Sequence, residues 1–417
     1  MLGNLQIFLF IAAISFTVIL SLNLPATDQQ RKSAEGIFIK VNGKQFVKDR
    51  QPFYINGLNA YWLMSMASEP TEKEKVSIAL HQASLLGTNV VRTWAFSDAD
   101  DYFPLQISPG FYNEKMFKGL DFVISEAKKN GLLLILSLVN NNEEFGGKEQ
   151  YVEWAREKGQ PISSSDDFFT NDLVKRFYKH HVKTILTRKN SISEIQYKDD
   201  PTILAWELIN EPRCNSDISG YTLQAWIEEM SAYVKTIDNN HLLEIGLEGF
   251  YGDSIADRKQ FNPNNNGVGT DFISNNLVPG IDFATIHIYP EQWIPGSNLM
   301  DQFVFLQSWI QGHIRDSDEI LNKPLLITEF GRSCQNSYSI DLEVRENLYK
   351  LVYSYIYASA KEGGAGAGSL FWQLLVHGQD DLRDGYEVII SETPSSAFIV
   401  YDQSQRLLTL NNAFSIT

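Results

Sequence analysis

Two glutamates close apolar segments of the chain, where they could act as a pair of catalytic carboxyl groups. Glu211 ends the run Leu204-Ala-Trp-Glu-Leu-Ile-Asn-Glu211 and is followed by Pro212, and Glu329 ends the run Leu325-Leu-Ile-Thr-Glu329. Hydrolysis of a glycosidic bond needs two carboxyl groups flanking the bond, one protonated as an acid and one ionised as a nucleophile or base. Because proline disfavours a helical conformation in the residue before it, we expect the chain to stay extended up to Glu211.

Polar and aromatic residues stand at the ends of three further apolar segments. They are Arg92, then His287 and Tyr289, and finally Trp372. The tripeptide Asn210-Glu-Pro is by itself a weak signal, since it occurs by chance in roughly one chain in twenty of this length at average composition. Chance placement of such residues at five segment ends is improbable, so the constellation predicts a single active face.

Eight short apolar runs are the elements that must position these residues. They begin near Phe53, Asn89, Leu132, Ile203, Leu242, Phe283, Leu325 and Ser369, and amphipathic stretches lie between most of them. Residues 132–139 are apolar at both parities, as a strand covered on both faces requires. The alternation of strands and helices predicts a parallel sheet, and eight such units predict an α/β fold with a single (β/α)8 TIM barrel. A doubly wound open sheet would give a similar pattern and is the alternative.

Some helix boundaries are marked in the sequence. Thr71 with Glu74 predicts a capping box, and Gly87 predicts the end of the same helix. Asn113 and Asn130-Gly131 bracket the next helix in the same way.

Two features are expected outside the repeat of strands and helices. Residues 37–47 alternate around Asn42-Gly43, which favours an N-terminal β-hairpin with both central residues at positive φ. Residues 140–167 make the interval after the third strand long, so we expect a long loop at the C-terminal face, where barrels bind their substrates. This loop contains Tyr151 and Trp154.

The N-terminal part resembles a secretory leader, because residues 7–22 form an uncharged run of apolar and small residues before a polar stretch. We divide the chain into a signal peptide at 1–26, with its cleavage site left open, a linker at 27–35 and one catalytic domain at 36–417. No Lys or Arg precedes the apolar run, so an uncleaved membrane anchor is the alternative. Once the leader is removed, we expect secretion to the extracellular space or cell wall, without stable membrane association.

Composition and charge narrow the possible ligands. The 417 residues are 43% hydrophobic, 12% aromatic and 21% charged, which is typical of a globular protein with a large core. The formal net charge of −16 argues against nucleic acid and anionic membranes as partners, because both bind to positive fields. A neutral substrate fits better, while the oligomeric state is not predicted.

Cysteine and acidic residues suggest neither a disulfide framework nor a metal site. Only Cys214 and Cys334 are present, and two free thiols are expected. A single bridge between them stays open, because the sequence does not give their Cα separation. Asp380, Asp381 and Asp384 could suggest a cation, but Leu382 breaks the calcium-loop spacing and favours a solvated acidic loop. We expect no metal and no organic cofactor.

Longer motifs carry a family resemblance that extends from Gly36 to about Leu408. They are Asn59-Ala-Tyr-Trp-Leu-Met64, Arg92-Thr-Trp-Ala-Phe96, Leu105-Gln-Ile-Ser-Pro-Gly110, Gly146-Gly-Lys148, Trp206-Glu-Leu-Ile-Asn-Glu-Pro-Arg-Cys214, Gly246-Leu-Glu-Gly-Phe250, Thr328-Glu-Phe-Gly331 and Phe371-Trp-Gln373. These motifs resemble the plant-type endo-β-1,4-mannanases of glycoside hydrolase family 5. The resemblance implies a barrel that cleaves internal β-1,4 bonds of mannan, galactomannan and glucomannan with retention at the anomeric carbon.

The resemblance also implies individual roles. Glu211 would be the acid/base and Glu329 the nucleophile, while Asn210 would bind the 2-hydroxyl of the cleaved sugar. Arg92 would keep Glu329 ionised through its opposite charge. Glu207 shares the inward parity of Glu211 but lies one pleat deeper, so we expect a buried structural carboxylate with a basic or hydroxyl partner.

Aromatic and imidazole side chains would complete the cleft. Tyr289 would orient Glu329, and His287 would belong to the polar network around the catalytic pair. Trp372 would be the platform beneath the sugar ring, and Trp62 would be a further wall. Four tryptophans stay open between core packing and sugar stacking: Trp62 itself, Trp94, Trp154 and Trp293.

Two other functions are weighed against this one. A β-1,4-glucanase would share the fold and the mechanism, because mannose and glucose differ only at the 2-hydroxyl. An inactive carbohydrate-binding barrel would be expected to lack one of the two glutamates, and both are present. Residues 140–144 and 377–384 depart from what we expect of the family, so subsite preference and transglycosylation depend on loops that the resemblance does not cover.

Overall fold

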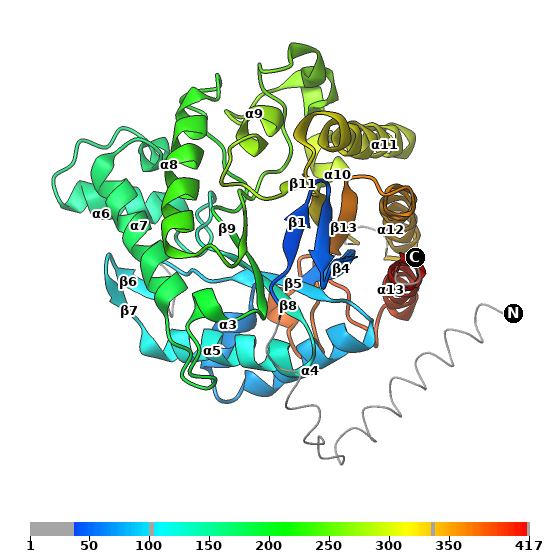
Figure 1. Cartoon of the computed structure of the whole chain (residues 1–417), viewed down its shortest axis with the longest axis horizontal. Coiled ribbons are helices and arrows are strands. Elements are labelled where there is room, and N and C mark those ends of the chain that lie inside the picture. Colours follow the sequence, from blue (N-terminus) through cyan, green and yellow to red (C-terminus); the bar gives the residue numbers. More distant parts are fainter. Residues whose placement is uncertain (1–36, 100–103, 335–337, 415–417) are drawn as a thin grey trace, which may run out of the picture.

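The structure, a computed structural model, describes residues 37–99, 104–334 and 338–414 (Figure 1). The predicted signal peptide at 1–26 and the linker at 27–35 lie outside these residues. Among the helices that are described, none is long and apolar enough to span a bilayer.

Eight parallel strands form the centre of the molecule, in the order β10-β9-β8-β5-β4-β13-β12-β11. All eight predicted strands are present. The last begins at Gly366 rather than near Ser369, because its first residues are glycine and alanine instead of branched apolar residues. The bounds are β4 Ile55–Asn59, β5 Val90–Trp94, β8 Leu133–Ser137, β9 Ile203–Glu207, β10 Leu242–Glu244, β11 Ala284–Ile288, β12 Leu325–Phe330 and β13 Gly366–Phe371.

The sheet closes on itself. The last strand in the sequence, β13, pairs with the first, β4, and Gly368 lies opposite Ile55. A Cβ at position 368 would lie 2.2 Å from the carbonyl oxygen of Ile55, so the absence of a side chain permits this approach. Between β10 and β11, the backbone N–H of Asp282 donates to the carbonyl of Leu243. The predicted barrel is confirmed, and the doubly wound alternative is wrong.

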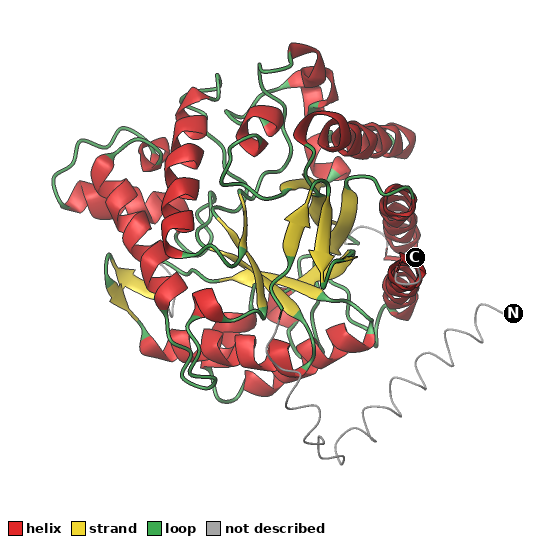
Figure 2. Cartoon of the chain, in the orientation of Figure 1, coloured by secondary structure: helices red, strands yellow, loops and turns green. Residues whose placement is uncertain are grey.

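Helices surround the strands on the outside, as Figure 2 shows. The main hydrophobic core lies between the layer of strands and the layer of helices, and the strands are buried along nearly their whole length. The helices are α3 Leu63–Ser68, α4 Lys73–Leu85, α5 Glu114–Lys129, α6 Gly147–Glu157, α7 Asp172–Thr187, α8 Tyr221–Ile237, α9 Phe272–Asn276, α10 Pro290–Trp293, α11 Leu299–Asp316, α12 Tyr338–Lys361 and α13 Pro394–Phe414. A two-stranded ribbon, β6 Gln106–Ser108 with β7 Phe111–Tyr112, precedes α5.

The structure confirms some of the predicted helix boundaries and contradicts one. The Asn113 side chain accepts a hydrogen bond from the N–H of Lys115 and caps α5, as predicted. The predicted capping box of Thr71 with Glu74 is wrong, since α4 begins at Lys73 and its N-cap residue makes no side-chain cap. Gly87 follows the end of α4 with a φ of +69°, as expected for a helix-terminating glycine.

The N-terminal hairpin is present and covers the end of the barrel where the strands begin. β1 Lys40–Asn42 pairs with β2 Gln45–Lys48, and β3 Gln51–Pro52 adds a third antiparallel strand. Only Gly43 of the turn has positive φ, so the turn is shifted by one residue from the predicted one. Phe46 packs edge to face on Phe283 inside the barrel, which leaves the opposite end of the barrel open for a ligand.

The long segment after β8 is partly helical. It contains α6 and the short helix Ser165–Phe168 before α7 begins. Tyr151 is fully buried and Trp154 is 5% exposed, and both pack among aromatic residues of the core. Of the two alternatives left open for Trp154, core packing is therefore the one that the structure shows.

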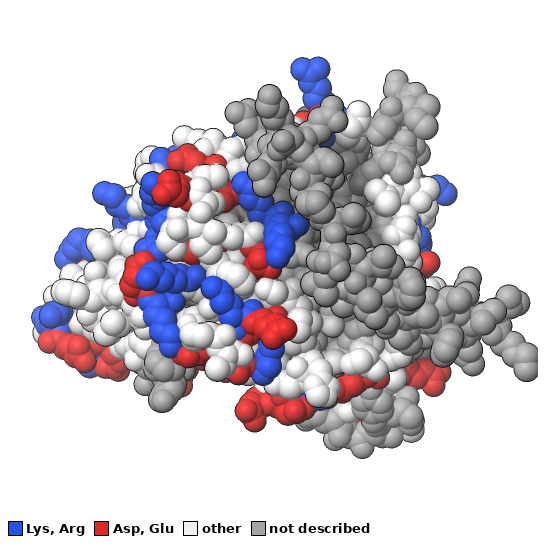
Figure 3. Space-filling view, turned by 90° about the horizontal axis from the view of Figure 1, so that it is seen from below, with Lys and Arg blue, Asp and Glu red and all other residues white. Residues whose placement is uncertain are grey.

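Basic and acidic side chains are interspersed on the part of the surface that Figure 3 shows outside the grey atoms. No continuous basic patch is visible there among the described residues.

Candidate active site

The open end of the barrel holds a cleft with two adjoining compartments of about 580 Å³ and 230 Å³. Four residues line both compartments: Asn142, Glu211, Glu329 and Trp372. The two predicted catalytic glutamates therefore stand at the junction of the compartments. A separate groove of about 450 Å³ lies between α12 and α13, away from the strand ends, and includes none of the predicted site residues.

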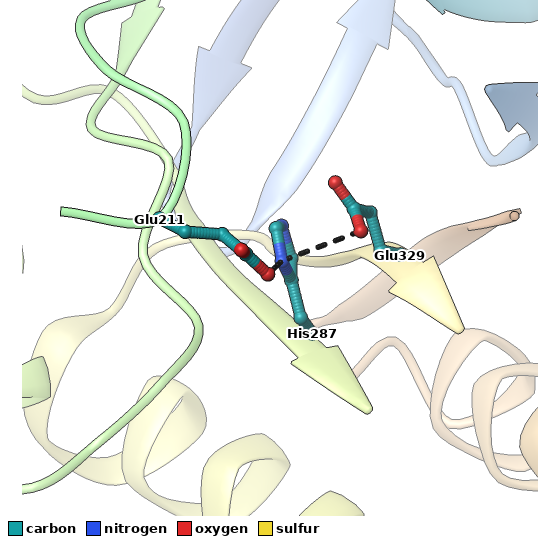
Figure 4. A group of neighbouring side chains, drawn as sticks. All are labelled: Glu211, His287 and Glu329. Atoms are coloured by element: carbon teal, nitrogen blue, oxygen red, sulfur yellow. Dashed lines mark hydrogen bonds and ion pairs between the residues drawn. The ribbon is translucent and has the colours of Figure 1, made fainter. Parts of the chain in front are cut away.

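Glu211, His287 and Glu329 form a compact group (Figure 4). One carboxylate oxygen from each glutamate and one ring nitrogen of the histidine all lie within 4.8 Å of one another. His287 Nδ1 is 2.7 Å from Glu211 Oε1 and 3.7 Å from Glu329 Oε2. Carboxyl groups about 5 Å apart are typical of retaining glycosidases, whereas inverting enzymes separate them by about 6.5–9.5 Å.

Arg92 lies beneath this group and is fully buried. Its Nε and Nη2 donate to the two carboxylate oxygens of Glu207 over 2.6 and 2.8 Å. Nη1 donates to Glu329 Oε1 over 2.6 Å, and Nη2 also donates to Asn210 Oδ1 over 2.6 Å. The structure thus places Arg92 against Glu329 and gives Glu207 the buried basic partner that was expected. A guanidinium suits this position because it presents several donors in one plane.

Glu329 is held by two donors. Besides Arg92, the hydroxyl of Tyr289 donates to Glu329 Oε2 over 2.7 Å. The Glu329 side chain is only 6% exposed, so its carboxylate has little freedom to reorient. The predicted contact between Tyr289 and Glu329 is therefore present.

The main chain at Glu211 departs from the predicted extended conformation. Its φ is +52°, in the left-handed region that residues other than glycine rarely adopt. The following Pro212 favours β or polyproline II backbone at Glu211, so contacts elsewhere in the structure must hold the left-handed conformation. Backbone strain of this kind costs about 1–3 kcal/mol and clusters at active sites. The turn directs the Glu211 carboxylate, which is 20% exposed, into the cleft.

The pKa values of the three grouped side chains are linked. Burial raises the pKa of Glu329, and the positive charges of His287 and Arg92 act against it. Burial acts in the same direction on Glu211, but the hydrogen bond and charge of His287 outweigh it and lower the pKa of Glu211. Burial disfavours a charged imidazole, yet the carboxylates of Glu329 and Glu211 raise the pKa of His287. Together these effects favour a charged histidine next to an ionised Glu211.

Asn210 lies between the third and fourth strand ends. Its Oδ1 accepts from Arg92, and its Nδ2 donates to Asn140 Oδ1 over 3.0 Å. Asn210 is 6% exposed and lines the smaller compartment. The structure thus brings Asn210 to the cleft with its amide orientation set by two partners.

Aromatic rings line the smaller compartment. Trp372 is stacked with Tyr61 at a centroid distance of 5.7 Å and an interplanar angle of 8°, and Trp94 and Phe145 complete the wall. The prediction for Trp62 is wrong: this residue is 2% exposed and its Nε1 donates to the Leu374 carbonyl inside the core. The two residues form the turn between β4 and α3, and it is Tyr61 that lines the smaller compartment.

Charged and polar residues line the larger compartment, and the sequence analysis missed most of them. Arg213 donates to both oxygens of Glu248 over 2.6 and 2.7 Å. Burial and the charge of Glu211 raise the pKa of Glu248 to about 7, against the opposing effect of Arg213. Arg213 and Glu248 both lie in motifs that carry the family resemblance, and no other feature of the sequence indicated that they belong to the site. Other lining residues that were missed are Gln292, Tyr386 and Asp384, and Trp293 also lies on this wall.

The acidic loop after β13 has a structural role. Trp372 Nε1 and Gln373 Nε2 donate to Asp384 Oδ2 over 3.0 and 2.9 Å. Arg383 pairs with Asp380 and with Glu392. Asp380 and Asp384 thus have partners within the protein, and Asp384 links the loop to the aromatic platform.

Cys214 and Cys334 are both free, the first buried and the second half-buried. The alternative of a bridge between them is therefore wrong. Among the described residues, Glu211, His287 and Glu329 are the one group with ligand atoms close enough for a metal ion. Each of the three already has a hydrogen-bond or ion-pair partner within this network.

Comparison with known proteins agrees with this geometry. The family described as GH family 5 beta-mannosidase-like matches residues 36–378. Mannan endo-1,4-beta-mannosidase 1 of Oryza sativa subsp. japonica is 56% identical over 382 residues, covering 91% of this chain and 88% of the rice protein. Mannan endo-1,4-beta-mannosidase 7 of Arabidopsis thaliana is 52% identical, covering 91% of this chain and 88% of that protein.

A solved structure shows the same architecture. The endo-1,4-beta-mannanase from Rhizomucor miehei superposes with a TM-score of 0.75 at 30% identity, over 89% of this chain and 99% of that chain. The match to the family covers most of the described barrel, including both strand ends that carry the paired glutamates. The chain therefore belongs to the β-mannosidase-like family of glycoside hydrolase family 5.

Proposed function

We propose that this protein is a retaining endo-β-1,4-mannanase that hydrolyses internal β-1,4-mannosidic bonds of mannan, galactomannan and glucomannan. The observation that carries the proposal is the position of Glu211 and Glu329 at the junction of two cleft compartments. A bond held at this junction has room for sugar units on both sides, as internal cleavage requires. The choice of mannan is supported by relatives named mannan endo-1,4-beta-mannosidase at more than half identity over most of the chain.

The reaction proceeds in two displacements. Glu329 attacks the anomeric carbon while Glu211 protonates the departing glycosidic oxygen. A water molecule then attacks the glycosyl-enzyme, and Glu211 takes its proton. Both carboxyl groups reach the same bond because their oxygens lie within 4.8 Å. Two inversions at one carbon leave the configuration retained.

The proton must move within the group before the first displacement. A charged His287 holds Glu211 ionised, whereas the proposed reaction needs Glu211 protonated. Transfer of the Nδ1 proton to Glu211 Oε1 across their 2.7 Å hydrogen bond produces this state. Glu329 keeps its donors Arg92 and Tyr289 regardless of the state of His287, so it is the carboxylate that stays ionised.

Asn210 and Trp372 supply the sugar contacts next to the cleaved bond. Asn210 stands beside Glu211 with its amide fixed, and we assign it the 2-hydroxyl. Trp372 lines both compartments, so its ring can support the sugar whose anomeric carbon reacts. His287 serves as the proton partner of Glu211 and contacts no sugar.

We also propose that the protein is secreted to the extracellular space or cell wall, on the basis of the apolar run at residues 7–22. N-terminal sequencing of protein recovered from the culture medium tests this proposal. A mature N-terminus near residue 27 supports it. Retention of the whole chain in the membrane fraction contradicts it and favours the anchor.

Substrate choice is tested by measuring the release of reducing ends from galactomannan, glucomannan, xylan and carboxymethyl cellulose side by side. Activity on the first two alone supports the proposal. Activity on carboxymethyl cellulose without galactomannan supports the β-glucanase, and no activity on any polymer supports the inactive barrel. NMR of the first product released from mannohexaose tests retention, because a β-anomer is expected before mutarotation.

A further inference from the structure

The turn that carries Glu211 depends on a side chain from another loop. Residues 210–213 have three backbone N–H groups, since Pro212 has none. The first two donate to backbone carbonyls at the neighbouring strand ends, Val139 and Gly246. The third, the N–H of Arg213, donates instead to Oδ1 of Asn141 over 3.0 Å.

Asn141 binds this turn on both sides of Glu211. Its backbone N–H donates to the carbonyl of Asn210 over 3.0 Å, and its side chain accepts from Arg213. Glu211 lies between these two bonds with a φ of +52°. Because an unsupported chain relaxes out of the left-handed region, the bonds hold the residue where its carboxylate meets His287.

The opposite side of the turn is rigid. The N–H of Glu211 donates to the carbonyl of Gly246 over 2.9 Å. A Cβ at position 246 would lie 1.9 Å from the carbonyl of Ile209, so the end of β10 is pressed directly against the turn. On this side the support comes from the backbone alone, and Asn141 supplies the one side-chain bond to the backbone N–H groups of residues 210–213.

The same segment after β8 also anchors the chain beyond the turn. Lys148 Nζ donates to the carbonyl of Arg213 over 2.9 Å and to Asp166 Oδ1 over 2.7 Å. Asp166 Oδ2 accepts from the N–H of Ser216 over 2.8 Å. The long interval after the third strand therefore contributes several contacts to residues 210–216, and this gives it a purpose other than sugar contact.

We infer that Asn141 is a positioning residue for Glu211, and this rests on the proposed role of Glu211 as the acid/base. Asn141 does not line either compartment of the cleft, whereas Asn140 and Asn142 on each side of it do. It therefore acts through the turn and not on the sugar. Its loss should weaken proton donation to the glycosidic oxygen more than any other part of the reaction.

The test compares two substrates with the variant Asn141→Ala. Mannohexaose has a sugar leaving group that needs a proton, whereas a dinitrophenyl β-mannotrioside has one that leaves without it. The value of kcat/KM covers only the first displacement for both substrates. We expect a loss of roughly tenfold to a hundredfold on mannohexaose and a much smaller loss on the aryl glycoside. The ratio of the two losses does not depend on the fraction of folded enzyme, because both are measured on one sample.

Two further variants complete the design. Asn141→Asp keeps an acceptor oxygen in the same place and should recover most of the activity on mannohexaose. Glu143→Ala changes an exposed neighbour that does not line the cleft, and both rates should stay at the wild-type value. Equal losses of Asn141→Ala on both substrates, or no loss on mannohexaose, would overturn the inference. A wild-type enzyme without activity on mannohexaose would instead contradict the proposed function.

Discussion

Arg92 Nη1 lies 2.6 Å from Glu329 Oε1 within the barrel, where the arginine has no contact with solvent. The same guanidinium binds Glu207 through two other nitrogens, so one cation serves two carboxylates. Buried charges are tolerated only with such partners. Glu207 thereby fixes the plane of the guanidinium, and the guanidinium fixes the carboxylate proposed as nucleophile.

Arg92→Lys should disrupt both functions of this residue. A lysine ammonium cannot bind Glu207 in a bidentate manner and reach Glu329 as well. We expect kcat/KM on mannohexaose to fall by roughly two to three orders of magnitude, as for the loss of one fixed donor at a reacting group. The thermal unfolding midpoint should fall too, because a buried carboxylate loses its partner. A variant with wild-type turnover would contradict the assigned role.

Azide should distinguish the two glutamates by the anomer it forms. In Glu329→Ala, azide takes the place of the nucleophile and should yield an α-mannosyl azide from an activated aryl mannoside. In Glu211→Ala, azide attacks the glycosyl-enzyme and should yield the β-anomer. Both variants should lose several orders of magnitude in turnover on mannan, within the range of about 10⁴–10⁶ for catalytic groups. NMR of the product gives the anomer, and exchanged anomers would reverse the two roles.

Asp384 should matter for the aromatic platform. Its Oδ2 accepts from Trp372 Nε1 and Gln373 Nε2, so Asp384→Ala leaves the Trp372 ring without its polar anchor. We expect kcat/KM on mannohexaose to fall about tenfold, which corresponds to roughly 1.4 kcal/mol. Asp381→Ala is the matched control, because Asp381 lies exposed in the same loop and does not line the cleft. Equal effects of the two substitutions would rule out a specific role for Asp384.

Asp121 should make the stability depend on pH in the acid range. It is fully buried, and although burial favours its neutral form, hydrogen bonds from Arg188, Tyr197 and Ser191 lower its pKa. A lowered pKa means that its stabilising contribution is complete above the usual value of 3.8 and is lost as the pH falls through the folded-state pKa.

Asp121→Asn should therefore reduce the free energy of unfolding by about 3 kcal/mol at pH 7, the lower limit for a broken buried pair. We expect the difference from wild type to shrink as the pH falls below about 3.8 toward the lowered folded-state pKa, as the wild-type carboxylate becomes protonated. Urea unfolding at several pH values measures it. Asp199→Asn, at an exposed position, provides the control, and a difference that grows toward low pH would refute the prediction.

The fold was predictable because its signals are local. Each buried parallel strand is a continuous apolar run, and the eight runs between residues 53 and 371 fall on the eight barrel strands. Predictions failed where a neighbour in space decided the outcome. Thr71 lies near a helix that starts two residues later, and Glu211 adopts a left-handed conformation instead of the extended one.

The site was predictable to the level of strand ends but not of individual side chains. Trp62 and Tyr61 are adjacent aromatic residues in one motif, and nothing local distinguishes the one that faces the cleft. Arg213 and Glu248 could be found only in three dimensions, because their pairing joins loops that follow different strands.

The sequence by itself determined that two carboxylates, an arginine, an imidazole and a tryptophan meet at one end of the barrel, because parallel strands bring all their carboxyl ends to the same face. Only the tertiary structure decided which of these side chains contact one another. Arg92 and Glu329 are 237 positions apart, and their hydrogen bond exists because the closed sheet places β5 and β12 around a common interior. The left-handed turn at Glu211 is likewise decided by Asn141 and Gly246, which reach it from two other strand ends.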